Sequence, residues 1–325
     1  ETRHTDTPTT QGKRIMKRGV RMIKVGCCGY PTSMKKYYET FRLVELNNTF
    51  YQYPRMSTVV GWREKAPEDF EFTVKAHQDI SHKFKLKLEP STQAFEQMKQ
   101  ICRTLRARIL LIQTPGSVRP DRLEDAYEFF SKINREDLGL AWETRGPSWD
   151  EPSVREKLAK MLTELNVTHV TDLLKIMPAY TGTVAYFRLH GLGAQMYYYQ
   201  YTDEELRGLY ELIEPLEADG KQVYVLFNNM SMFDDGIRFM HYIESSKFPS
   251  LTGAVGLDSV RKVIEKTRCP IAKGVLSKRL GWKLVELEEG KQARLDELLK
   301  DLPSKSYESV EEVLQEIKRT RQVQR

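Results

Sequence analysis

Short runs of β-branched and other apolar residues alternate with longer amphipathic segments along most of this chain. This alternation is typical of repeated βα units around a parallel sheet. Eight runs predict strands, at residues 23–27, 43–47, 70–75, 109–113, 138–143, 167–172, 184–190 and 223–228. Helices are predicted between them, at residues 91–104, 123–132, 152–166 and 203–216, with Thr202 as the N-cap of the last.

Eight strands within about 210 residues fit a compact (β/α)₈ TIM-like barrel better than an open doubly wound sheet. After Phe248 the alternation stops, and short, charged helical segments follow. Ser306 or Ser309 is predicted to cap a final helix at residues 310–318. We therefore predict three parts: a basic flexible arm at 1–21, a barrel at 22–256, and a small, mainly helical C-terminal domain with a basic tail at 257–325.

The composition, 40% hydrophobic and 30% charged over 325 residues, is that of a soluble globular protein. No apolar run reaches the roughly 18 to 20 residues of a membrane span, and the start lacks a signal-peptide pattern, so we expect a cytoplasmic protein without membrane association. Four dispersed cysteines are expected to be reduced thiols. The net charge of +6 fits either simple solubility or attraction to an anionic partner such as nucleic acid.

One carboxylate interrupts the second apolar run. Side chains alternate along a strand, so Glu45 and Asn47 are expected on one face, and Val44 and Leu46 on the other. A carboxylate taken out of water without partners costs several kcal/mol. The fold must therefore supply donors to Glu45 or use it in an activity.

Polar residues also gather where the other predicted strands end. In a parallel barrel these ends open on one face, where the active sites of this fold lie. Strand ends that border solvent are often polar, but so many Glu, Lys, Arg and His residues favour a site. The residues concerned are Glu45, Asn47, Lys75, His77, Gln113, Glu143, Arg145, Asp172, Arg188, His190, Asn228 and Asn229.

Four of these residues are candidate catalytic groups. Glu45 and Glu143 could face a central ligand as acid and base, and His190 and His77 could carry a proton near neutral pH. The opposing interpretation is that each histidine is a hydrogen-bonded structural residue.

Three cations are candidate ligands for an anionic substrate. Arg145 and Arg188 suit bidentate binding of a phosphate or carboxylate, and Lys75 adds a point charge. The alternative is that Arg188 and Lys75 neutralise the two glutamates inside the barrel.

A metal and an aromatic surface complete the predicted site. Glu45, Glu143 and Asp172, with a histidine, would suit Mg²⁺, Mn²⁺ or Zn²⁺, although no His-x-His or Cys-x-x-Cys spacing supports a metal. Tyr198 and Tyr201, in an aromatic loop, are expected to stack on bases or sugars. The alternative is a lid that packs its own rings. Substrate contacts are also expected from Asn47, Asn228 and Asn229.

A series of motifs carries a family resemblance. In order, they are Gly26-Cys27-Cys28-Gly29-Tyr30, Val44-Glu45-Leu46-Asn47-Asn48-Thr49-Phe50-Tyr51, Phe72-Thr73-Val74-Lys75-Ala76, Gln113-Thr114-Pro115, Glu143-Thr144-Arg145-Gly146-Pro147-Ser148-Trp149, Arg188-Leu189-His190-Gly191 and Phe227-Asn228-Asn229. From about residue 23 to 243 the chain resembles the YecE-like family of uncharacterised proteins. The resemblance implies a TIM-barrel-like fold and no activity. Relatives more often show Thr-Ser at Cys27-Cys28, so a hydroxyl role there is in doubt. The segment from Leu302 to Ser309 resembles a small helical module of unknown function.

These observations favour a hydrolase or lyase that acts on a phosphorylated substrate, with a nucleic-acid phosphodiester as the expected class. Such an enzyme would be of the nuclease or phosphodiesterase type, and its partner a nucleic acid or a phosphorylated small molecule. Two alternatives remain open: a carboxylate-pair enzyme acting on a sugar-like substrate, and a non-catalytic nucleic-acid-binding protein that uses its basic ends.

Overall fold

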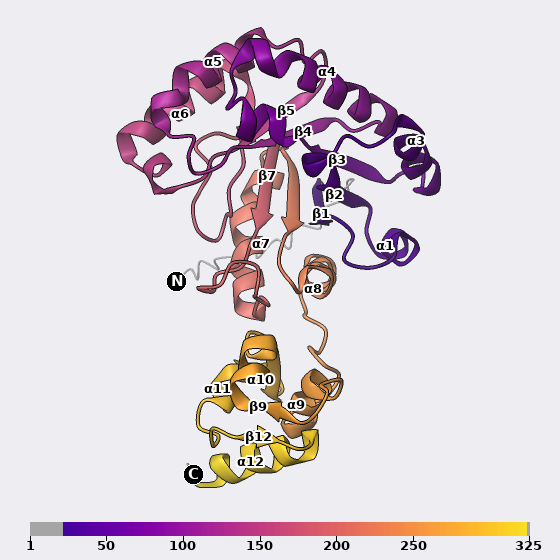
Figure 1. Ribbon diagram of the computed structural model, residues 1–325, viewed down its shortest axis with the longest axis vertical. Coiled ribbons are helices and arrows are strands. Elements are labelled where there is room, and N and C mark those ends of the chain that lie inside the picture. The colour runs from indigo at the N-terminus through magenta and orange to yellow at the C-terminus, as the bar shows by residue number, and fades with distance from the viewer. Residues whose placement is uncertain (1–21, 324–325) are drawn as a thin grey trace, which may run out of the picture.

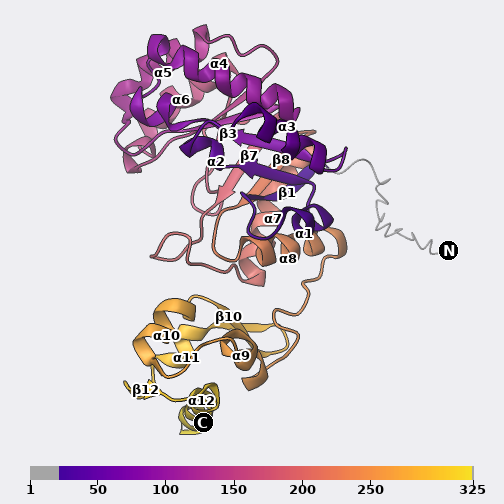
Figure 2. The same cartoon turned by 45° about the vertical axis from the view of Figure 1, so that its right-hand side comes forward.

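Eight parallel strands form the larger part of the molecule (Figures 1 and 2). The structure is a computed structural model that describes residues 22–323, so the predicted arm at 1–21 lies outside the described residues. The strands are β1 Ile23–Cys28, β2 Leu43–Leu46, β3 Glu71–Lys75, β4 Ile109–Gln113, β5 Gly139–Glu143, β6 Val167–His169, β7 Val184–Leu189 and β8 Gln222–Phe227. The predicted (β/α)₈ barrel is confirmed.

The order of the strands is β6-β5-β4-β3-β2-β1-β8-β7. The seam between β6 and β7 is closed by a parallel bridge from Thr171 to Phe187 and by the Arg188 N–H, which donates to the Thr171 carbonyl at 3.0 Å. β6 is only three residues long, shorter than the predicted run, and no regular helix separates it from β7 in the described chain. The barrel is therefore nearly closed, with an isolated bridge in place of a strand ladder at this seam.

Helices cover the outside of the barrel. They are α1 Met34–Thr40, α2 Asn48–Tyr51, α3 Met56–Lys65, α4 Leu88–Leu105, α5 Leu123–Lys132, α6 Pro152–Leu165, α7 Asp203–Ala218 and α8 Met232–Ser245, with shorter turns of helix at Asp79–Lys83, Pro120–Arg122 and Pro147–Trp149. The predicted cap of α7 is present: Thr202 Oγ1 accepts the Glu205 N–H at 3.2 Å, and the Glu205 carboxylate accepts the Thr202 N–H at 2.8 Å.

Period-two alternation divides the apolar residues between two cores. Val44 and Leu46 pack outward in the core between sheet and helices. Leu43 packs inside the barrel, and Glu45, two residues later, points to the same interior. Asn47 does not share that face, because the strand ends at Leu46 and Asn47 has helical backbone angles at the start of α2.

The chain after the barrel forms a separate small core, here called the C-terminal unit (residues 250–323). Its helices are α9 Leu257–Ile264, α10 Lys273–Leu280, α11 Leu295–Leu299 and α12 Val310–Val323. Two antiparallel sheets accompany them: β10 Leu284–Glu288 with β11 Lys291–Arg294, and β9 Ile271–Ala272 with β12 Ser306–Tyr307. The sequence pattern predicted only the helices. Ser309 caps α12, because its Oγ accepts the Glu312 N–H at 3.1 Å.

The C-terminal unit lies beyond the ends of β7 and β8 (Figure 1). It contacts the loop between β7 and α7: Gln200 Oε1 accepts the Leu284 N–H at 2.9 Å, and the Arg294 guanidinium lies 4.0 Å from the centre of the Tyr199 ring. The Asp203 N–H donates to Gln292 Oε1 at 3.0 Å. These contacts join the unit to the face of the barrel that carries the predicted site.

Across residues 22–323, no helix has both the length and the apolarity needed to cross a bilayer.

The close approach of β1 to β2 gives a prediction about stability. A Cβ on Gly26 would lie 2.3 Å from the Leu43 carbonyl oxygen, so Gly26→Ala must push the two strands apart. We expect the free energy of unfolding of the barrel to fall by about 3 kcal/mol, the upper end of overpacking costs. Gly61→Ala in α3 is the control, because no atom lies within 4 Å of its Cβ and alanine favours a helix by about 0.5–1 kcal/mol. Denaturant unfolding measures both; equal stability of the two variants would contradict this account of the barrel wall.

Candidate functional site

One arginine stands at the centre of the barrel interior. Arg188 on β7 is 1% exposed, and its Nε donates to both oxygens of Glu45, at 3.2 and 3.1 Å. Its Nη2 donates to Glu45 Oε1 at 2.9 Å, and its Nη1 donates to Glu143 Oε2 at 2.5 Å. The carboxylates come from β2 and β5, three strands apart, so a single guanidinium joins three parts of the barrel wall.

Glu45 is fully partnered by protein groups. Beyond Arg188, its Oε2 accepts the hydroxyl of Tyr186 at 2.7 Å, and that hydroxyl is 2.8 Å from Thr73 Oγ1. The nearby Cys28 thiol is held neutral, because burial and then the charge of Glu45 raise its pKa well above the ordinary value. Glu45 therefore acts as the counter-ion of Arg188, which is the neutralising role that the sequence left as an alternative.

Glu143 is held in its ionised form. Burial alone would raise its pKa, but Arg188, Arg145 and His190 together lower the pKa to about 2. Arg145 Nη2 lies 2.6 Å from Glu143 Oε1. A carboxyl group with so low a pKa has no proton to donate near neutral pH, so Glu143 is unsuited to the role of general acid.

His190 is a neutral imidazole whose basic nitrogen is occupied by Arg145. Burial is the main cause that lowers its pKa. Arg145 Nη2 donates to His190 Nε2 at 2.9 Å, which assigns the ring proton to Nδ1. Nδ1 lies 3.8 Å from Asp172 Oδ2, and the same oxygen accepts the backbone N–H of His190 at 3.0 Å. Asp172 thus orients His190, and Arg145 covers its basic nitrogen.

Lys75 is the cation at the mouth that lacks a carboxylate partner. Its Nζ donates to Gln113 Oε1 at 2.7 Å and lies 4.1 Å from the centre of the Phe50 ring, and no carboxylate of the described chain comes within ion-pairing distance of it. Burial, and next the charge of Arg188, lower its pKa to about 8. Lys75 therefore exchanges its proton near neutral pH.

We call these side chains, which cluster where the strands end, the barrel mouth: Glu45, Lys75, Gln113, Glu143, Arg145, Asp172, Arg188 and His190. Three of them are cations and three are carboxylates, while His190 is neutral. The charges of the mouth nearly cancel, so they offer no large excess of positive charge to a polyanion.

Two of the predicted site residues are packed away from the mouth cluster. His77 stacks on Tyr53 with ring centres 3.8 Å apart, and its Nδ1 accepts the Asp79 N–H at 3.2 Å. Tyr201 is completely buried, and its hydroxyl accepts the Gly191 N–H at 2.7 Å. This position leaves Tyr201 no free face, so the stacking role predicted for it does not fit the structure.

The remaining predicted contacts lie at the edge of the mouth or support its loops. Asn229 Nδ2 donates to the Tyr199 carbonyl at 2.8 Å and to Asp235 Oδ2 at 2.7 Å, so Asn229 fixes a loop. Tyr198 is 37% exposed and packs edge-on against Trp282 of the C-terminal unit. Two further residues, Asn47 and Asn228, are half-buried just beyond their strands.

The predicted metal ligands are not assembled into one centre. The oxygens of Glu45 and Glu143 are directed at Arg188, and Asp172 lies beside His190. Within residues 22–323, no group of three or more His, Cys, Asp or Glu residues is arranged to hold a metal ion. The set Glu45, Glu143 and Asp172 therefore does not fit a metal as predicted.

Sequence reasoning missed two residues that build the site. Tyr186 and Thr73 hold Glu45 from β7 and β3. Tyr186 could have been found, because it stands two positions before Arg188 and so shares its inward face. Thr73 could have been found in the same way, because it stands two positions before Lys75 and so shares the face of β3 that carries Lys75.

The barrel part of this chain matches a known family of proteins. Residues 28–245 match the family described as "Protein of unknown function DUF72". The UPF0759 protein YunF of Bacillus subtilis (strain 168) is 27% identical over 252 residues, which cover 65% of this chain and 89% of that protein. The UPF0759 protein YecE of Escherichia coli (strain K12) is 39% identical over 56 residues, covering 17% of this chain and 21% of that protein.

Two solved structures share the fold. A DUF72 family protein from Enterococcus faecalis V583 has a TM-score of 0.59 at 22% identity, covering 69% of this chain and 98% of that chain. One from Thermotoga maritima MSB8 has a TM-score of 0.55 at 26% identity, covering 69% of this chain and 100% of that chain. The family match ends at residue 245, before the C-terminal unit.

The two ion pairs of Arg188, with Glu45 and Glu143, predict that removing the arginine strongly lowers the stability of the protein. Arg188→Met would leave two buried carboxylates unpaired, so we expect the free energy of unfolding at pH 7 to fall by about 3–5 kcal/mol. Adding Glu45→Gln and Glu143→Gln to this variant removes the unpaired charges and should restore part of the loss. Denaturant titration measures all three proteins. A loss below about 1 kcal/mol in Arg188→Met would show that the cluster is not the buried network described.

Proposed function

The chain belongs to the DUF72 family of proteins of unknown function, and we propose that it is a hydrolase or lyase that acts on a phosphorylated substrate at the barrel mouth. The expected substrate class is a nucleic-acid phosphodiester. The observation that carries the proposal is that two groups able to exchange protons, Lys75 with a pKa of about 8 and the neutral His190, both lie near the Arg188–Glu143 ion pair at the barrel mouth. Groups with perturbed pKa values at this face of a barrel are candidates for acid and base.

Arg145 is the group best suited to bind the phosphate. Its side chain is 24% exposed, and its buried Nε has no hydrogen-bond partner in the described chain. A phosphate that draws the guanidinium toward itself would also release His190 Nε2 from Arg145. Substrate binding would in this way expose the base at the moment when it is needed.

The remaining steps follow from the two proton-exchanging groups. His190 Nε2 accepts a proton from the attacking water, whose oxygen forms a bond to phosphorus. The bond from phosphorus to the leaving oxygen breaks, and the Lys75 ammonium donates its proton to that oxygen. In the lyase version of the reaction, His190 Nε2 takes a proton from the carbon next to the one that carries the phosphate, and the electrons of that C–H bond form a carbon–carbon double bond. The bond from carbon to the phosphate oxygen breaks, and the Lys75 ammonium donates its proton to the departing phosphate.

Glu45, Glu143 and Arg188 have a supporting role in this scheme. Their charges satisfy one another, so they fix the geometry of the mouth. Burial, and next the charge of Arg188, lower the pKa of Lys75, whereas Glu45 and Glu143 raise it. The alternative of a carboxylate pair acting on a sugar is less favoured, because both carboxylates face the same guanidinium instead of an open space.

The proposal is tested with purified protein on single- and double-stranded DNA and RNA and on p-nitrophenyl phosphodiesters, with Mg²⁺, Mn²⁺, Zn²⁺ or EDTA. We expect His190→Gln and Lys75→Met each to lower turnover by about 10²–10⁴-fold, the usual contribution of acid–base groups. Lys83→Met is the control, because this exposed lysine lies in the loop after β3 and outside the mouth. Turnover that survives both mouth variants would exclude this assignment of acid and base.

The pH dependence of kcat/KM gives a second prediction. A reaction that needs the Lys75 ammonium should slow as the pH rises through about 8. An arginine keeps its charge above pH 12, so Lys75→Arg should be slower overall but should lose this alkaline limb. The rates are measured from pH 6 to 10 on the substrate identified above. An alkaline limb that is unchanged in Lys75→Arg must come from another group and would argue against Lys75 as the acid.

A further inference from the structure

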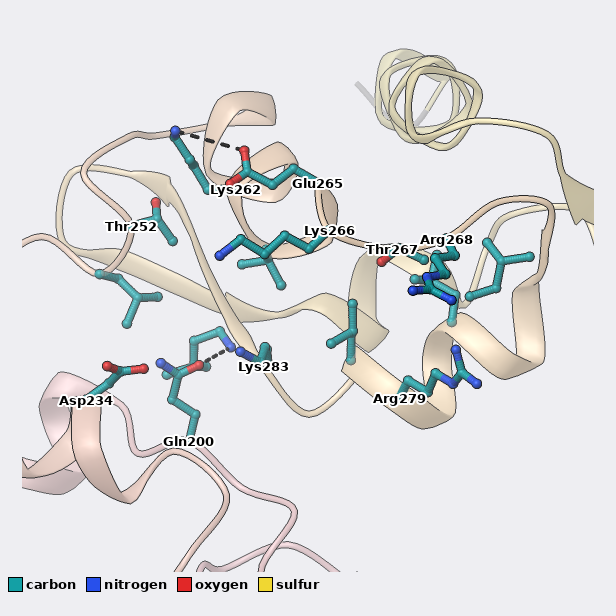
Figure 3. Close-up of a pocket in the computed structure, with 16 residues that line it drawn as sticks. Gln200, Asp234, Thr252, Lys262, Glu265, Lys266, Thr267, Arg268, Arg279 and Lys283 are labelled. Atoms are coloured by element: carbon teal, nitrogen blue, oxygen red, sulfur yellow. Dashed lines mark hydrogen bonds and ion pairs between the residues drawn. The ribbon is translucent and has the colours of Figure 1, made fainter. Parts of the chain in front are cut away.

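A cleft with a cavity of about 710 Å³ lies between the barrel and the C-terminal unit (Figure 3). Gln200 and Asp234 line it from the barrel side, and segments around α9, α10 and β10 line it from the other. We call it the cationic cleft because five basic side chains line it: Lys262, Lys266, Arg268, Arg279 and Lys283. The two acidic residues in its wall are Asp234 and Glu265, so positive charges exceed negative ones by three.

Most of these cations have no protein partner. Lys262 Nζ lies 4.0 Å from Glu265 Oε2, the limit of an ion pair. No ion pair or hydrogen bond joins the side chain of Lys266, Arg268 or Arg279 to any residue from 22 to 323. Figure 3 shows these three side chains along the cleft, on the segment after α9 and on α10. The contrast with the barrel mouth is sharp, because there the arginines are engaged by carboxylates.

The cleft also offers an apolar surface. Three half-buried aliphatic side chains line it together with the cations, Leu251, Val263 and Leu280, while the other three aliphatic residues of its wall, Ile271, Leu276 and Leu284, are buried. An inorganic anion would contact only the charged side chains of such a site. An acidic peptide would reach them with carboxylates on flexible side chains, which lose conformational freedom on binding. A nucleotide carries both a flat, poorly hydrated base and a charged phosphate, so it uses both kinds of lining.

We propose that the cationic cleft binds a single-stranded nucleic acid, with phosphates at the Lys and Arg side chains and bases against the aliphatic wall. A duplex fits less well, because its bases are stacked and paired and cannot contact that wall. The occupant is therefore a single strand or an unpaired end.

One loop connects this cleft to the barrel mouth. The chain leaves the mouth at His190, passes the exposed Tyr198, and reaches the cleft wall at Gln200, whose side chain bonds to the backbone of Leu284. Tyr198 packs against Trp282, next to Lys283 of the cleft. A strand held in the cleft would thus lie near the loop that starts at His190. This last step rests on the proposed function, whereas binding in the cleft does not.

Fluorescence anisotropy with a labelled 12-nucleotide oligo(dT) tests the proposal on the full chain. The cleft variant combines Lys266→Gln, Arg268→Gln and Arg279→Gln. The control variant combines Lys35→Gln, Lys157→Gln and Lys160→Gln, which also removes three exposed positive charges, but from α1 and α6. We expect the cleft variant to bind at least tenfold more weakly and the slope of log K against log salt to fall by about 2, while the control stays near wild type.

Each outcome separates this proposal from the proposed function. Equal affinity of the cleft and control variants would overturn the proposal that the cationic cleft binds nucleic acid. Equal binding of a 12-base-pair duplex and the single strand would overturn its preference for single strands. Circular dichroism checks that both variants are folded, and Leu251→Asn, at a half-buried residue of the aliphatic wall, provides a second variant that should also weaken binding. If the cleft variant loses binding but the protein turns over no phosphodiester, the proposal of binding in the cleft is supported and the proposed enzymatic function is contradicted.

Discussion

The guanidinium of Arg188, bonded to Glu45 on one side and Glu143 on the other, is the interaction on which the interior of this barrel depends. Three charges buried together cost several kcal/mol in desolvation, which only close contacts and additional hydrogen bonds can offset. The structure supplies them through Tyr186, which donates to Glu45. The backbone of Arg188 also closes the seam of the barrel by donating to Thr171, so the same residue serves the fold and the site.

This arrangement determines which groups remain available for chemistry. Because the glutamates satisfy Arg188, neither is free to move a proton. The candidate proton-exchanging groups are Lys75, which hydrogen-bonds to Gln113 and not to a carboxylate, and His190, whose Nε2 accepts from Arg145 and lies 3.8 Å from Glu143 Oε1. It also determines where a polyanion can be held. The charges of the mouth nearly cancel, whereas the cationic cleft has an excess of positive charge. The two proposals therefore divide the work: proton transfer is proposed at the barrel mouth, and binding of the phosphate backbone is proposed in the cleft.

The sequence predicted the strands because their apolar runs are short and regular, and it predicted the inward face of Glu45 because alternation is a local rule. It left open whether Arg188 or a substrate would meet Glu45, because closure of the barrel brings together residues 143 positions apart. Tyr201 was misassigned since nothing local distinguishes a ring packed beneath a loop from one exposed on it. The hairpin of β10 and β11 was missed because both strands are short and β11 is mostly polar, and because its stability comes from packing in the C-terminal unit.

The most direct test of this account is a titration of Lys75 by NMR. Lysine labelled with ¹³C at Cε reports the protonation of each amine, and the signal absent from Lys75→Arg identifies Lys75. Burial beside the Arg188 cluster predicts a midpoint near pH 8. A midpoint near 10.5, the ordinary value for lysine, would mean that the amine is solvated or paired with a carboxylate, and it would contradict the assignment of Lys75 as the acid of the site.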